Sequence, residues 1–435
     1  MEAIFEPYEP NQSHLLPPAP RDWLPEGHLA HFVSDTVDQV DLAPFLRKYA
    51  DRASGKGQKA YHPAMMLKIL IYSYCAGIFS SRRIMAALSE LVPLRYLAAG
   101  HCPGHRTIAR FREQNLERFR SVFVEVVRIA RAAGLVSMGT LAVDGSRVKA
   151  NASKHKAMSY KRMKEAERKL KEEIRKITRL AQKTDTAEDA EFGPDFRGDE
   201  LPEELRRRED RLKKIQEAKR RLEAEQAEED DRTGRGDQGR KLQRPRGVPP
   251  DRAQSNFTDP DSRIMSTDGK SFEQCYNAQS AVDGAHRIIV AAEVGTSAAD
   301  VGSLLPMVDA AERNTDAKAK RVLADSGYKS ETNLRGLEER GADGYVALGK
   351  GEQAPDDVDP SRPATRRMAR KLRTKAGRKQ YQRRKGMAEP PFGWIKNVLG
   401  FRSFSVRGLG KANGEWNLVC LAVNLRRMHG MMAWE

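Results

Sequence analysis

Leu141-Ala142-Val143-Asp144-Gly145 joins an apolar run to a carboxylate and a glycine, with Thr140 in front of it. This pattern predicts a short buried strand that ends at Asp144, where a turn begins. The pattern returns far downstream as Arg321-Val322-Leu323-Ala324-Asp325-Ser326-Gly327-Tyr328. Two strands of this kind in one sheet would present both carboxylates at its carboxyl edge, and hard divalent cations prefer such oxygen ligands. The alternative is that each Asp only caps a turn, because Asp-Gly is a common turn pair.

The composition favours a polyanionic partner. The 435 residues are enough for two or three domains and a sizeable hydrophobic core. The chain has 77 Lys and Arg and 60 Asp and Glu, which gives a net charge of +17. Nucleic acid is a better candidate than a membrane, because basic side chains that neutralise phosphates release the counterions of the polymer.

Cysteine usage and apolar runs exclude several classes of protein. Cys75, Cys102, Cys275 and Cys420 form no CxxC pair, so neither a disulfide framework nor a cysteine zinc site is predicted. The first residues are acidic and lack a signal region, and the most apolar run (65–79) is too short to span a bilayer. We expect a cytoplasmic protein with no membrane partner.

The first third of the chain predicts an extended arm and then a helical DNA-binding domain. Residues 1–25 are rich in proline, and from 26 to 136 the apolar residues recur at helical spacing. Short helices with exposed basic residues are typical of helix-turn-helix DNA binders, and a plain helical bundle with a solvated basic face is the alternative. The candidate DNA contacts in this domain are Arg106, Arg110 and Arg112.

Three helices are predicted in detail within this domain. One begins after His62-Pro63, and a second follows Ser80-Ser81, whose hydroxyls suit a helix start. A third begins at Thr107 and is expected to continue through Ile129.

A helical hairpin is predicted between the first strand and the rest of the sheet, over residues 151–255. Residues 154–183 hold 12 Lys and Arg against 4 Asp and Glu, with apolar residues at heptad-like spacing. Residues 184–204 hold 9 acids and a single Arg, and 205–232 is helical again. Residues 233–255 are expected to be a flexible basic return linker. The role of the hairpin stays open between a DNA arm, a dimer contact and a spacer.

After the hairpin, strands and helices alternate. The predicted elements are, in order, strand 276–283, strand 288–294, helix 298–313, the strand before Asp325, helix 331–340, strand 344–348 and a loop at 349–365. Together with the Asp144 strand they predict a mixed α/β core, which we place at residues 137–150 and 256–435.

A third carboxylate follows a dense positive run. Residues 366–385 carry 11 Lys and Arg and no acid, which favours phosphate binding over a merely solvated face. A Pro pair follows Glu389 and suits the first turn of a helix, so Glu389 is expected at the amino end of that helix. If the helix packs beside the first strand, Asp144, Asp325 and Glu389 meet at one sheet edge. They would hold two divalent ions about 4 Å apart, which activate water and then a 3′-hydroxyl for in-line attack on a phosphodiester. The side chains expected near the scissile strand are Tyr381, Arg384 and Lys396.

These residues resemble the DDE transposases of bacterial insertion sequences, most closely the IS5/IS1182-like group. The resemblance rests on Asp144-Gly, Asp325-Ser-Gly-Tyr and the Tyr381/Arg384/Glu389/Lys396 cluster, with four residues between Arg384 and Glu389 where the wider group has three. Further similar segments are Asn256-Phe-Thr-Asp-Pro-Asp261, Tyr276-Asn-Ala-Gln279, His62-Pro-Ala-Met-Met-Leu-Lys68 and Arg106-Thr-Ile-Ala-Arg-Phe-Arg112. The resemblance covers nearly the whole chain. It implies a ribonuclease-H-like core, Mg²⁺ or Mn²⁺ as cofactor, DNA contacts from Tyr381, Arg384 and Lys396, and cleavage at terminal inverted repeats followed by strand transfer into target DNA.

We therefore predict a divalent-metal-dependent DNA transposase of the bacterial cytoplasm, associated with the nucleoid, with Asp144, Asp325 and Glu389 as catalytic metal ligands. Its partner is double-stranded DNA, and the synapsis of two ends argues for a homodimer in the DNA complex. The alternatives are a metal-dependent nuclease that does not join strands and a transposase-derived DNA-binding regulator.

Overall fold

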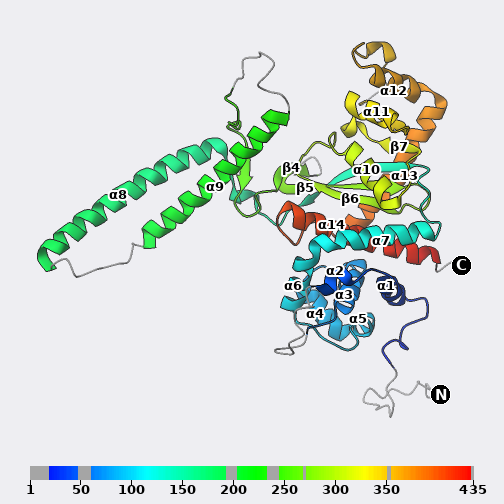
Figure 1. The fold of residues 1–435 in the computed structure, drawn as a ribbon, viewed down its shortest axis with the longest axis horizontal. Helices are drawn as coiled ribbons and strands as arrows, with labels where there is room; N and C mark the ends of the chain where they lie inside the picture. Colours follow the sequence, from blue (N-terminus) through cyan, green and yellow to red (C-terminus); the bar gives the residue numbers. More distant parts are fainter. Residues whose placement is uncertain are drawn as a thin grey trace, which may run out of the picture.

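The computed structural model is a mixed α/β structure (Figure 1). N-terminal helices form the lower part of the view, a mixed sheet with its covering helices forms the upper part, and a long helical hairpin projects to one side. The described residues are 19–47, 60–192, 203–232, 244–267, 271–349 and 354–432.

The N-terminal region is helical. Its helices are α1 (Leu29–Asp38), α2 (Ala43–Leu46), α3 (Pro63–Cys75), α4 (Ser81–Glu90), α5 (Val92–Leu97), α6 (His105–Asn115) and α7 (Phe119–Ala132). The His62 ring accepts from the Ala64 amide (3.2 Å) and caps α3, while Pro63 fills the first helical position. The helix starts predicted at His62-Pro63 and Ser80-Ser81 are confirmed, although the Ser80 side chain makes no capping hydrogen bond. Of the predicted extended arm, residues 1–18 lie outside the described residues and 20–23 form a turn.

The long third helix predicted from Thr107 is broken into two. α6 ends at Asn115 and α7 begins at Phe119, with a 3-10 turn, Leu116–Arg118, between them. Gly414 of the C-terminal helix, α14 (Leu409–Met432), lies against the backbone of this turn, where a Cβ would come within 2.6 Å of a carbonyl carbon. This close crossing coincides with the break, and it ties the N-terminal helices to the rest of the fold.

A mixed sheet forms the centre of the molecule. Its strands are β1 (Leu141–Lys149), β4 (Arg263–Thr267), β5 (Ser271–Asp283), β6 (Ile289–Gly295), β7 (Arg321–Ala324) and β8 (Asp343–Val346). β5 pairs along one edge with β1, antiparallel, and along the other with β4 and β6. Beyond β1 lie β7, parallel to β1, and β8, parallel to β7. The predicted order of these elements is confirmed, although β4 is not among the predicted strands.

β1 does not end at Asp144, so the turn predicted there is wrong. The strand continues to Lys149, and Asp144-Gly145 lies inside its ladder with β5. A Cβ on Gly145 would lie 2.9 Å from Asp300 Oδ1 and would overlap the Gln279 side chain. Close approach of two side chains, and not a turn, therefore requires the glycine.

One hydrophobic core runs from the N-terminal helices through α14 into the sheet. α14 lies between α3 and α7 on one side and β6 on the other (Figure 1). Its buried Trp416 donates the indole N–H to the Gln279 carbonyl (2.9 Å). The domain boundary that we placed after residue 136 falls between α7 and β1, and the core is continuous across it.

Four more helices cover the sheet. Among the described residues these are α10 (Leu304–Thr315), α11 (Glu331–Glu339), α12 (Pro363–Arg373) and α13 (Lys375–Asn397). α10 starts six residues later than predicted, because the loop before it bends to bring Asp300 to the sheet, 2.6 Å from the Asn277 side chain.

Glu389 lies past the middle of α13 and not at the amino end of a helix, so that prediction is wrong. Pro390 and Pro391 lack the N–H groups that would bond to carbonyls four residues earlier. The helix continues nevertheless, because it packs on β1, β7 and β8 through buried Met387 and Ala388. Tertiary packing here overrides the local signal of the prolines.

The predicted hairpin is present as α8 (Tyr160–Phe192) and α9 (Glu203–Arg232), which pack along each other. A small ladder of β2 (Ala157–Ser159) and β3 (Gln254–Asn256), also not predicted, closes its root. Part of the acidic tip (193–202) and the first half of the predicted linker (233–243) lie outside the described residues. Within the described ranges, none of the helices has the length and apolarity that crossing a membrane requires.

Candidate active site

Asp144 and Asp325 lie at the same level of adjacent parallel strands. The register pairs Ala142 of β1 with Leu323 of β7, and each carboxylate follows two residues later. Asp325 comes directly after β7, where its Oδ1 accepts from the Gly327 amide (2.8 Å) and caps a 3-10 turn. The structure thus brings together the two carboxylates that the repeated strand pattern indicates.

Arg384 joins the third predicted carboxylate to the first. Its guanidinium, on α13, lies 3.4 Å from Asp144 Oδ2 and 3.3 Å from Glu389 Oε1. The Asp144 side chain is 15% exposed and the Arg384 side chain 10%, whereas the Glu389 side chain is 53% exposed. Tyr381, one turn before Arg384, is partly buried against the sheet. Arg384 is predicted to contact DNA, but here it is turned inward as the cation between two carboxylates.

Burial raises the pKa of Asp144 to about 6. The positive charge of Arg384 and a hydrogen bond from the Gly145 amide (2.9 Å) act against this rise, and the charges of Asp325 and Glu389 add to it. These carboxylates therefore share one negative electrostatic environment, which would attract a cation.

A fourth carboxylate, Asp300, lies in the same place. Its Oδ1 accepts from the side-chain amides of Asn277 (2.6 Å) and Gln279 (2.7 Å), which face it from β5. A Cβ on Gly327 would lie 3.1 Å from Asp300 Oδ2 and 3.0 Å from Asp325 Oδ1. The glycine that follows each of the two predicted aspartates thus makes room for Asp300.

Tyr328 supports the Gln279 amide that binds Asp300. Its hydroxyl donates to Gln279 Oε1, which fixes the orientation of that amide. Burial raises the pKa of Tyr328, and the charges of Asp300, Asp144 and Asp325 raise it further.

Sequence reasoning missed Asp300 because the residue lies in a loop between β6 and α10. A signal was present in Tyr276-Asn-Ala-Gln279, since amides two residues apart on a strand project to the same face. Two amides on one face of a buried strand indicate that a polar group must lie opposite them.

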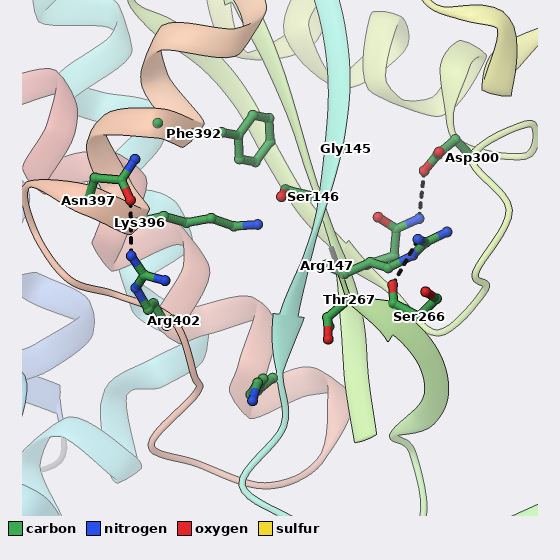
Figure 2. Close-up of a pocket in the computed structure, with 13 residues that line it drawn as sticks. Gly145, Ser146, Arg147, Ser266, Thr267, Asp300, Phe392, Lys396, Asn397 and Arg402 are labelled. Atoms are coloured by element: carbon green, nitrogen blue, oxygen red, sulfur yellow. Dashed lines mark hydrogen bonds between the residues drawn. The ribbon is translucent and has the colours of Figure 1, made fainter. Parts of the chain in front are cut away.

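A hollow of about 580 Å³ opens beside β1, and its lining includes Asp300 and Gly145, the residue after Asp144 (Figure 2). Lys396, predicted to contact DNA, points from α13 toward β1 across this hollow. The hollow has one acidic lining residue, Asp300, which already accepts from two amides. Its basic lining residues are Arg147, Lys149, Lys396 and Arg402. Positive charge is therefore concentrated around this hollow, and such a surface attracts polyanions.

Of the three arginines predicted to contact DNA from the helical domain, two are exposed. Arg106 and Arg110 lie on the outer side of α6. Arg112 is 8% exposed and donates to a backbone carbonyl (2.7 Å) and to the Tyr74 hydroxyl (3.3 Å). That hydroxyl donates in turn to Glu415 of α14 (2.8 Å). Arg112 thus belongs to the interior between α3, α6 and α14, and we no longer expect it to reach DNA.

The carboxylates are of the chemical type that binds divalent cations. Asp144, Asp325 and Glu389 offer the oxygen ligands that Mg²⁺ and Mn²⁺ prefer. Among the side chains that the structure describes, no three acids, histidines or cysteines converge closely enough to hold an ion. At this site the Arg384 guanidinium lies between Asp144 and Glu389, 3.4 Å from the first carboxylate and 3.3 Å from the second.

Comparisons with known families give two matches. Residues 236–425 match the model of a transposase DDE domain, and residues 19–114 match the model of a transposase domain (DUF772). Asp325, Glu389 and Asp300 lie inside the first match, whereas Asp144 precedes it on the other side of the hairpin. Nothing among the curated proteins or the solved structures matches the chain. The two domains are typical of IS5/IS1182-family DDE transposases, which confirms the resemblance seen in the sequence.

Proposed function

Because the chain carries both domains of an IS5/IS1182-type DDE transposase, we propose that it cuts DNA at the terminal inverted repeats of an insertion sequence and joins the 3′ ends to target DNA. Asp144, Asp325 and Glu389 are the catalytic carboxylates of this proposal. The observation that supports it is the placement of these residues: two follow matched positions of neighbouring parallel strands, and the third is linked to the first through Arg384. Metal-assisted attack of water or a 3′-hydroxyl on a phosphodiester needs such a set of carboxylates.

The proposal includes a ribonuclease-H-like core. In support, the strands follow the order β6-β5-β1-β7-β8, with antiparallel pairing from β6 to β1 and parallel pairing from β1 to β8. The first carboxylate lies on the middle strand of this order, and the second directly follows the strand beside it. The helix that carries the third packs across the same strands.

Mg²⁺ or Mn²⁺ would be held by Asp144, Asp325 and Glu389, and when bound it would activate the attacking oxygen and balance the charge of the phosphate. The chain itself holds the carboxylates in place. Asp300, fixed by two amides, lies against Gly145 and Gly327, the glycines that follow the two aspartates, and so packs between the segments that carry them. Arg384 keeps Asp144 neutralised in the metal-free chain.

The DNA would lie along the basic hollow beside β1. Its four Lys and Arg can neutralise phosphates next to the scissile bond. Arg106 and Arg110 of α6 remain the proposed contacts of the helical domain, which would position the duplex. Because transposition joins two ends, we propose that two copies of the chain act together in the DNA complex.

A cleavage and strand-transfer assay tests the proposal. Linear DNA with candidate element ends and a second duplex as target would be incubated with the protein and Mg²⁺ or Mn²⁺. The wild type would be compared with Asp144→Asn, Asp325→Asn and Glu389→Gln, which remove charge with little change in shape. We expect metal-dependent joined products from the wild type and a loss of at least a hundredfold in each variant.

Two other outcomes would favour the alternatives. Cleavage without joining would identify a nuclease that uses the same carboxylates. Binding of the element ends with no chemistry in the wild type, and no difference among the variants, would identify a DNA-binding regulator.

A further inference from the structure

The helical hairpin is fixed to the core at its root. Arg221 of α9 pairs with Asp261, whose other oxygen accepts from the Leu409 amide at the start of α14 (2.7 Å). Arg263 of β4 pairs with Glu225 of α9 (2.8 Å). Because both links end on elements of the core, the hairpin projects in a defined direction (Figure 1).

The two helices of the hairpin bury their own apolar side chains. The buried residues are Tyr160, Met163, Leu170, Ile215 and Leu222. Acids on the inner side are paired with the opposite helix, Glu167 with Lys219 (3.0 Å) and Glu173 with Arg208 (3.1 Å). In the described part of the hairpin no large apolar side chain is exposed. The described part of the hairpin therefore offers a second protein no large apolar surface on which to dock.

The outer surface of the hairpin is strongly basic. Over residues 160–179 and 206–231, 16 Lys and Arg are exposed against 8 exposed Asp and Glu. On α8, six of the exposed cations recur every three or four residues and share one side of the helix. They are Lys161, Lys164, Arg168, Lys171, Arg175 and Arg179. At 1.5 Å per residue this row is about 27 Å long, which approaches the length of one turn of duplex DNA.

We propose that the hairpin is an arm that binds the phosphate backbone of duplex DNA outside the active site. A basic surface without apolar patches matches a polyphosphate, whereas a second copy of the same arm would be repelled. The hairpin is inserted between β1 and β5, so DNA bound along it continues toward the sheet that carries the catalytic residues. The proposal rests on the proposed function only in taking DNA as the substrate.

The test compares two triple variants of the full chain. Arg168→Gln/Arg175→Gln/Arg179→Gln removes three exposed charges from the arm, and glutamine keeps the helix propensity. Arg313→Gln/Lys320→Gln/Arg335→Gln removes three exposed charges near α10 and α11 as the matched control. Binding of a fluorescein-labelled 60-base-pair duplex would be followed by fluorescence anisotropy in EDTA, between 50 and 300 mM NaCl.

In the arm variant we expect the slope of log affinity against log salt concentration to decrease in magnitude by about 2 to 3. Each lost phosphate contact removes about 0.9 from this slope. The control should keep the wild-type slope. A wild-type slope in the arm variant would show that the hairpin does not bind DNA, and it would leave the transposase proposal unaffected. If the arm variant keeps the wild-type slope but changes its sedimentation coefficient, the arm forms a contact between copies of the chain, and the proposal of a DNA-binding arm is wrong. Failure of the wild type to bind DNA at all counts against the proposed function itself.

Discussion

The Arg384 guanidinium lies 3.4 Å from Asp144 Oδ2, where both side chains are largely shielded from water. Removal of one member of such a pair leaves the other charge buried and unpaired. We therefore expect Arg384→Gln to lower the free energy of unfolding in EDTA by about 3 kcal/mol. Mg²⁺ or Mn²⁺ should restore stability more in this variant than in the wild type, because the cation replaces the lost guanidinium. Urea denaturation with and without the metal measures both effects.

Arg383→Gln is the matched control, since Arg383 is the exposed neighbour on the same helix. It should leave stability and its metal dependence unchanged. Equal stability of Arg384→Gln and wild type in EDTA would show that Arg384 does not balance the carboxylates.

The raised pKa of Asp144 should make stability depend on pH in the absence of divalent ions. The pKa is about 6 in the folded chain and about 3.9 in an unfolded chain. Between these values the folded chain binds a proton that the unfolded chain does not, so this contribution is complete below about pH 4 and is lost as the pH rises to 6. The free energy of unfolding of the wild type minus that of Asp144→Asn should fall over this window by up to about 1.4 kcal/mol per pH unit, and stay level above it.

Urea denaturation in EDTA at half-unit steps from pH 4.5 to 7.5 checks this dependence. Asp309→Asn serves as the control, because a hydrogen bond from Arg340 lowers the pKa of Asp309. A lowered pKa changes the contribution to stability only below about pH 4, so the difference between wild type and Asp309→Asn should stay level over this range. A difference between wild type and Asp144→Asn that stays constant over the whole range would contradict the assignment of the raised pKa to Asp144.

The sequence was sufficient where short-range patterns carry the information. Apolar runs that end in a carboxylate predicted both strands, and their parallel register brings Asp144 and Asp325 together. Helical periodicity predicted the hairpin, and Pro63 and Ser81 are helix starts as predicted.

The errors arise where distant parts of the chain meet. Asp144-Gly145 predicts a turn, but the glycine is required because Asp300, which is far along the chain, packs against it and leaves no room for a Cβ. Pro390 reads as a helix start, but burial of the helix on the sheet keeps it inside α13. Arg112 reads as a surface cation, but α14 covers it and Tyr74 accepts from it. In each case a tertiary contact outweighs a local preference that is correct in isolation.

Gly145→Ala tests the packing of Asp300 against β1. A Cβ there would lie 2.9 Å from Asp300 Oδ1 and overlap the Gln279 side chain, so the substitution should displace the amides that hold Asp300. We expect a loss of about 1 to 3 kcal/mol in the free energy of unfolding, typical of overpacking, together with loss of DNA cleavage. Thermal unfolding and the cleavage assay measure the two effects.

Gly386→Ala is the control for Gly145→Ala. A Cβ on Gly386 meets nothing within 4 Å, and the residue lies inside helix α13. Alanine should therefore raise stability by up to about 1 kcal/mol, through helix propensity alone. Wild-type stability and activity in Gly145→Ala would show that Asp300 can withdraw from β1 without consequence.

Two neighbouring arginines of α6 should behave in opposite ways. Arg110 is exposed, so Arg110→Gln should leave stability unchanged and reduce the salt slope of duplex binding by about 1, the contribution of a single phosphate contact. Arg112 donates to the Tyr74 hydroxyl inside the protein. Arg112→Gln should therefore lower the free energy of unfolding by about 3 kcal/mol, because the buried acceptors and Glu415 lose their cation. As long as the variant is folded, the salt slope of its DNA binding should equal that of the wild type. Anisotropy titration and urea denaturation of both variants separate the two roles. A reduced slope in folded Arg112→Gln would mean that the helical domain opens around this residue when it binds DNA, since its side chain is otherwise covered by α14.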